Sequence, residues 1–170
     1  MIITKLISTI ASICILVIMV IAKPSDSLFA HGTEKHAAKA TMSGVTNTKD
    51  IKPIFDSRCS KCHGAKSPVH MEYVKDMKGY RKQMKGPRMD TYTHLTSFII
   101  WPDTGSLMRA LDDGSSTKDS KPGKMYKHLG KTEEQRQQNL TLFKAWVGNW
   151  MIKEWDEITK KEISTMKLMY

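Results

Sequence analysis

Cys59-Ser60-Lys61-Cys62-His63 is the most informative stretch of this 170-residue chain. Two cysteines three positions apart lie on one turn of a helix and point the same way, so both thiols can bond to one edge of a porphyrin. The next residue, His63, can then place its imidazole beneath the ring as a ligand of the iron. The motif therefore predicts one covalent haem c, attached through Cys59 and Cys62, with His63 as the proximal iron ligand.

Two other uses of a C-x-x-C pair fit this chain less well. A redox dithiol usually opens a helix that follows a strand, and no alternating apolar strand pattern precedes Cys59. A zinc site needs further ligands at metal spacing, but the only other cysteine is Cys14, in an apolar N-terminal stretch. The same count excludes a second covalent haem.

Residues 1–30 have the pattern of an export signal, with a short positive region at Lys5 and an apolar run over residues 6–22. Ala22 and Ala30 both suit a cleavage site, because a small residue precedes each cut. We expect the mature protein in the periplasm or an equivalent non-cytoplasmic compartment. The run of about 17 apolar residues leaves a retained membrane anchor as the alternative.

About 140 residues remain after this signal, which is enough for one modest core. Residues 31–47 are polar, rich in Ala and Thr and without an apolar period, and this pattern predicts a flexible linker. We therefore place the folded domain at residues 48–150 and a C-terminal helical extension at residues 151–170.

The apolar periodicity predicts an all-α protein of four to five helices joined by long loops, because strand patterns are essentially absent. The clearest helix begins at a capping box formed by Thr132 and Gln135, and its apolar residues then repeat at three- and four-residue steps up to Trp150. The other helices are predicted at residues 51–58, 69–85, 90–101 and 106–111, and in the extension.

The order of these segments resembles the class I c-type cytochromes, the mono-haem family that includes small exported bacterial electron carriers. The resemblance covers residues 48 to about 150 and rests on the haem motif and two later segments, Ser106-Leu107-Met108-Arg109-Ala110-Leu111 and Phe143-Lys144-Ala145-Trp146-Val147. It implies a cytochrome c-like fold around one covalent haem, and a one-electron carrier rather than an enzyme. No Ser/His/Asp set, paired carboxylates or Gly-rich phosphate loop stands in a context that indicates catalysis.

The sixth ligand of the iron determines whether the haem carries electrons or binds a molecule. Met125 is the leading candidate, because it ends the irregular loop Pro122-Gly123-Lys124-Met125, shortly before the closing helix. His128 is an alternative that would give a lower reduction potential, and Met108 is another. Without any such ligand, a five-coordinate haem would bind a small gas or serve as a catalytic centre.

The formal net charge is +10, from 27 Lys and Arg against 17 Asp and Glu. A basic exported protein is steered toward acidic redox partners or an anionic membrane surface, and its association weakens as salt rises. Permanent docking in a larger respiratory complex is a third expectation, whereas no nucleic-acid partner is expected because the chain is exported. Basic residues cluster around the motif and the segment after it: Lys49, Lys52, Arg58, Lys61, Lys66, Lys75, Lys78, Arg81, Lys82, Lys85 and Arg88.

Overall fold

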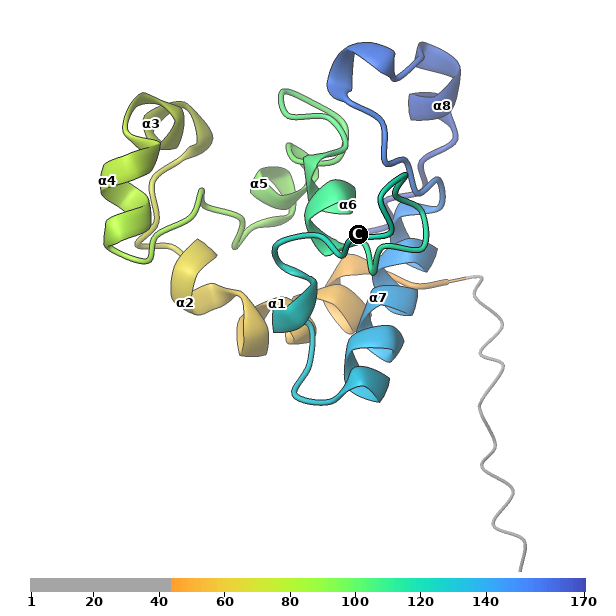
Figure 1. Ribbon diagram of the computed structural model, residues 1–170, viewed down its shortest axis with the longest axis horizontal. Coiled ribbons are helices and arrows are strands. Elements are labelled where there is room, and N and C mark those ends of the chain that lie inside the picture. Colours follow the sequence, from red (N-terminus) through yellow and green to blue (C-terminus); the bar gives the residue numbers. More distant parts are fainter. Residues whose placement is uncertain (1–43) are drawn as a thin grey trace, which may run out of the picture. The chain divides into compact units, whose positions relative to one another are not determined.

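The computed structural model describes residues 44–170, and this part of the chain consists of helices and loops without strands (Figure 1). The all-α prediction is therefore confirmed. The expected signal, both cleavage sites, Cys14 and residues 31–43 of the linker lie outside the described residues. In chain order the elements are η2 (Asn47–Ile51, a π-helical turn), α1 (Lys52–Arg58), α2 (Ser60–His63), α3 (His70–Lys75), α4 (Met77–Lys82), α5 (Tyr92–Thr96), α6 (Ser106–Leu111), η3 (Tyr126–His128, a 3₁₀ turn), α7 (Glu133–Val147), η4 (Trp155–Glu157, a second 3₁₀ turn) and α8 (Lys160–Ser164).

Part of the core lies where η2 packs against α7 (Figure 1). Ile51 at the end of η2 has no exposed surface, and neither have Trp146 and Val147 on α7. Burying a large apolar side chain of this kind stabilises a fold by about 1.5–3 kcal/mol. Because α1 continues directly from η2, this contact also holds the start of the haem motif against the body of the protein.

Helices α6 and α7 follow their predicted bounds closely. Thr132 caps α7 as expected, since its hydroxyl accepts a hydrogen bond from the backbone N–H of Gln135 at 3.3 Å. The helix ends at Gly148, whose φ of 82° favours glycine. Helix α6 covers residues 106–111 and starts after Gly105, which also has a positive φ.

Two of the predicted helices are wrong in their extent. The single helix expected over residues 69–85 is two short ones, α3 and α4, because Asp76 leaves the helical conformation and its carboxylate caps α4 through the N–H of Gly79 at 2.9 Å. The helix expected over residues 90–101 is only α5. Its end coincides with Thr96 and Ser97, whose hydroxyls donate back to carbonyl groups of the preceding turn.

The C-terminal segment, predicted as a helical extension, is helical only over the short elements η4 and α8 and is otherwise irregular. Separate caps at Glu154 and Thr159 start these two elements independently. The last residues return to the core: the indole N–H of Trp146 and the backbone N–H of Asn47 both donate to the carbonyl of Met169, at 2.7 and 2.8 Å. Among residues 44–170 no helix has the length and apolar character needed to cross a membrane.

Candidate functional site

The motif occupies the junction between α1 and α2. Cys59 ends α1, where its N–H donates to Phe55 at 2.8 Å, and its carbonyl accepts from the N–H of His63 at 2.9 Å. Cys59 and Cys62 are free thiols, both partly exposed. Helical geometry therefore places two unpaired thiols and an imidazole within one short segment, as the covalent attachment of a haem requires.

Two observations disfavour a redox dithiol and a zinc site at this cysteine pair. Burial raises the pKa of the Cys59 thiol to about 11, and the neighbouring Cys62 acts in the same direction. A redox dithiol needs the opposite, a thiolate with a lowered pKa. Within residues 44–170 no group of three or more His, Cys, Asp or Glu side chains is arranged to hold a metal ion such as zinc.

The imidazole of His63 is oriented by a backbone carbonyl. Its Nδ1 lies 2.8 Å from the carbonyl oxygen of Pro87, and a carbonyl can only accept, so Nδ1 carries the proton. Nε2 is then the nitrogen with a free lone pair, as in most metal-bound histidines. Burial lowers the pKa of His63, the bond to Pro87 opposes this, and His128 lowers it further. The neutral ring is the form that ligates iron.

The helix predicted over residues 69–85 ends directly before Gly86 and Pro87, and no role beside His63 is predicted for these two residues from the sequence. The backbone of Gly86 passes so close to the imidazole that a Cβ at this position would overlap the ring. Its N–H donates to the carbonyl of Cys62 at 2.8 Å, and the N–H of Met89 donates to the carbonyl of His63 at the same distance. The one available signal was a Gly-Pro pair downstream of the motif.

Met125 lies in the loop between α6 and α7 and is 38% exposed. The loop is attached to the end of α6, because the N–H of Met125 donates to Ala110 at 2.9 Å and that of Gly123 donates to Asp112 at 2.8 Å. Gly123 approaches the backbone of α6 too closely for any larger residue. The thioether of Met125 is thus carried by a loop with a defined path.

The alternative ligands occupy different surroundings. Met108 is fully buried within the hydrophobic core. His128 lies in η3, where its N–H donates to the carbonyl of Met125 at 2.9 Å, and it is close enough to His63 to affect the pKa of that ring.

Asp112, directly after α6, is a further residue for which no role is predicted from the sequence. It is completely buried, and its carboxylate accepts hydrogen bonds from the N–H groups of Gly114 at 2.8 Å and Ser116 at 3.3 Å. The indole N–H of Trp150 donates to its other oxygen at 2.9 Å. A buried charge with three donors orders the loop that leads to Met125.

Comparisons with known proteins gave a family match and a structural match. A family model described as PccH cytochrome c matches residues 46–170. The solved structure of the monoheme cytochrome PccH from Geobacter sulfurreducens is 53% identical, with a TM-score of 0.69, and the match covers 74% of this chain and 98% of that one. A search of curated proteins gave no match.

Proposed function

Since this chain belongs to the PccH cytochrome c family and is a monohaem c-type cytochrome that transfers electrons, we propose that its iron is six-coordinate, with His63 as proximal and Met125 as distal ligand. The covalent haem c supplies a one-electron redox centre, and the protein binds, orients and tunes it. Cys59 and Cys62 would carry the thioether bonds. With both axial positions filled by side chains, electron transfer requires no bond to a substrate.

The hydrogen bond between His63 and Pro87 is the observation that carries this proposal. It leaves Nε2 unprotonated and fixes the plane of the ring, and Gly86 provides the space that the ring occupies, because a Cβ there would overlap it. The Met125 loop supports the distal assignment, because backbone hydrogen bonds to the end of α6 hold it at both Gly123 and Met125. An axial methionine raises the reduction potential relative to a second histidine.

His128 is the alternative to Met125, supported by its place in η3, where its N–H donates to the carbonyl of Met125. A bis-histidine haem would also carry electrons, but at a lower potential. A five-coordinate haem that binds a small gas, or serves a larger respiratory complex, is the remaining alternative. The three differ in their spectra and in their reaction with carbon monoxide.

We also propose that residues 1–30 direct export to the periplasm or an equivalent compartment, with retention as an anchor as the alternative. The net charge of +10 supports acidic electron-transfer proteins as partners, and it is compatible with an anionic membrane surface. Either association should weaken with added salt.

The absorption spectrum of the purified holoprotein tests the ligand assignment. The oxidised protein should show the weak charge-transfer band at the red end of the visible spectrum that a Met–iron bond produces. Met125→Ala should abolish this band and allow rapid carbon monoxide binding to the reduced protein. The control is Met71→Ala, because Met71 is 65% exposed and lies on α3, outside the proposed ligand set. A band that survives Met125→Ala, or that disappears only in His128→Ala, contradicts the assignment.

A further inference from the structure

The segment that we term the α3–α4 arm, residues 64–88, leaves the haem motif and returns to it. Its N–H at Gly86 donates to the carbonyl of Cys62 at 2.8 Å, and the N–H of Arg88 donates to the carbonyl of Pro68 at 2.7 Å, which joins the two ends of the arm. In Figure 1, α3 and α4 stand apart from α7, with α2 at their base. The arm therefore projects from the motif itself.

The arm has its own internal order. The rings of Tyr73 on α3 and Tyr80 on α4 stack with centroids 6.1 Å apart. Arg81 donates from Nε to the hydroxyl of Tyr73 at 3.1 Å, and Asp76 caps α4 at the bend between the helices. These contacts tie the two short helices to one another, so the arm presents a preformed surface.

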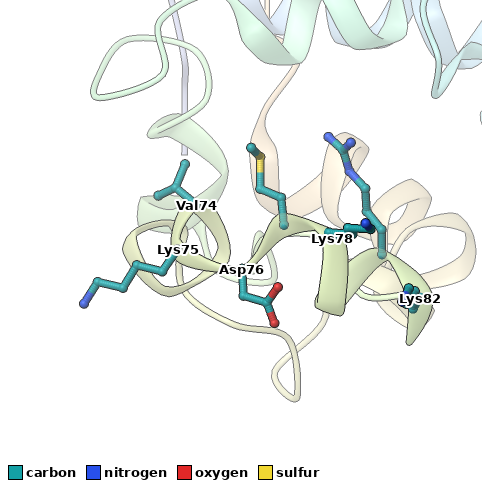
Figure 2. A pocket seen from close by; sticks show the side chains of 7 residues that line it. Val74, Lys75, Asp76, Lys78 and Lys82 are labelled. Carbon is teal, nitrogen blue, oxygen red and sulfur yellow. The ribbon is translucent and has the colours of Figure 1, made fainter.

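Apolar side chains are unusually exposed on this arm. Met71 and Met84 are 65% and 64% exposed, and Val74 and Met77 each expose about two fifths of their surface. Val74 and Met77 line a pocket of about 760 Å³. Figure 2 shows Val74 and Lys75 at the end of α3, Lys78 and Lys82 on α4, and Asp76 between them. Methionine is an adaptable apolar contact that suits binding surfaces.

Positive charge surrounds these apolar side chains. The two acidic groups of residues 66–85 already accept hydrogen bonds from backbone N–H groups: Glu72 from Val69 at 3.2 Å and Asp76 from Gly79 at 2.9 Å. In the described part of the chain, none of the basic groups of this stretch forms an ion pair. These groups are Lys66, Lys75, Lys78, Arg81, Lys82 and Lys85.

We propose that the α3–α4 arm is the docking surface for an acidic electron-transfer protein. An apolar centre within a charged rim is the usual anatomy of a specific interface, and unpaired cations favour an acidic partner by charge complementarity. The arm begins and ends beside Cys62 and His63, so it connects the proposed docking surface directly to the haem motif. This inference rests on the proposed electron-carrier function.

The test uses holoprotein labelled with ¹⁵N and oxidised cytochrome b5, a small acidic haem protein, as the probe. We expect shift changes in the NMR spectrum to concentrate on residues 64–88. A triple variant of the arm should raise the dissociation constant about tenfold at low salt, the loss expected for three rim charges. It combines Lys75→Gln, Lys78→Gln and Lys82→Gln. Lys160→Gln, Lys161→Gln and Lys167→Gln remove the same charge at exposed positions of the C-terminal segment and should change the dissociation constant less than about threefold.

The apolar centre is tested separately with Met77→Ser, which leaves the charge unchanged. It should weaken binding of the probe about threefold to tenfold at low and high salt alike, because the apolar contact is not screened. Since Met77 is 41% exposed and outside the main core, the variant should fold normally.

Three results would overturn the proposal. Equal weakening by both triple variants would show that only net charge matters. A footprint around the Met125 loop would place docking on another face. If the triple variant of the arm lost more affinity for vesicles of anionic phosphatidylglycerol than for the probe, the arm would instead be a membrane-binding surface. The ligand assignment is judged independently, because the red-end band of these variants should equal that of the wild type.

Discussion

The indole Nε1 of Trp150 donates a hydrogen bond to Oδ2 of Asp112 at 2.9 Å and thereby links the segment after α7 to the loop before Met125. The other carboxylate oxygen orders the N–H groups of Gly114 and Ser116. The carbonyl of Asp112 accepts from the N–H of Gly123. Asp112 therefore contacts the loop at its start, through Gly114 and Ser116, and near its end, through Gly123, and it also joins the loop to Trp150.

Trp150→Phe should lower the free energy of unfolding by about 1.5–3 kcal/mol, because it removes a hydrogen bond to a buried charged group. In this variant the red-end band should be lost at a lower urea concentration than in the wild type, because the Met125 loop has one attachment fewer. Urea unfolding followed by both the band and circular dichroism measures the two effects. Trp155→Phe is the matched control, because Trp155 is 68% exposed and should tolerate the change. Equal destabilisation by the two variants would show that the contact with Asp112 contributes nothing specific.

Gly86→Ala should lower both haem content and thermal stability, because the added Cβ would overlap the imidazole of His63. Overpacking of this kind typically costs about 1–3 kcal/mol. Gly130→Ala controls for overpacking in general, because its Cβ would overlap atoms of Gln135 and Arg136 rather than His63, and it should lower thermal stability without lowering haem content. Pyridine haemochrome absorbance per protein and thermal unfolding give the two readings. Full haem content in Gly86→Ala would show that the ring of His63 can move aside without consequence.

The parts of the molecule that were predictable from sequence are those encoded by neighbouring residues. The motif of Cys59 to His63 is local, and so are the cap at Thr132 and the helix over residues 106–111. The break between α3 and α4 at Asp76 is also a local feature. The apolar periodicity of residues 69–85 nevertheless predicts one continuous helix, because it gives no weight to the tendency of an aspartate to cap a new helix. Periodicity therefore predicted the presence of helical segments more reliably than their continuity.

The groups that orient the site depend on distant contacts. The acceptor for His63 is the carbonyl of Pro87, 24 positions away, and a backbone carbonyl has no signature in the sequence. Asp112 before a turn has the pattern of a helix end, and only its contact with Trp150, 38 positions later, reveals a buried carboxylate. Such relationships need the tertiary fold before they can be recognised.

Asp113 should make the protein less stable in acid. Partial burial acts to raise the pKa of Asp113, but hydrogen bonds from Ser115 and Gln137 and the charge of Lys144 outweigh it and hold the pKa at about 2, below the ordinary value of 3.8. A carboxyl group with a lowered folded-state pKa adds stability above its unfolded value, and this stability is lost as the pH falls toward the folded value. We expect the wild type to lose about 1–2 kcal/mol through this group between roughly pH 4.5 and pH 2, after allowance for solvent screening.

Asp113→Asn should remove most of this acid dependence, and urea unfolding at several pH values measures it. Asp156→Asn in the C-terminal segment is the control, because Asp156 is exposed and lies outside the group of residues that surrounds Asp113. If Asp113→Asn and the wild type lose stability in parallel below about pH 4, other carboxyl groups account for the acid sensitivity.

Removal of the last three residues, 168–170, should destabilise the protein although they form no helix. The carbonyl of Met169 is the acceptor for both the indole N–H of the fully buried Trp146 and the backbone N–H of Asn47, and truncation leaves both donors without it. Unsatisfied buried donors cost about 1–3 kcal/mol each, so the loss for two donors should reach about 2–6 kcal/mol and appear as a lower Tm of the holoprotein. Removal of Tyr170 alone keeps the carbonyl of Met169 and should cost much less. Similar Tm values for the two truncations would mean that water replaces Met169 as the acceptor without penalty.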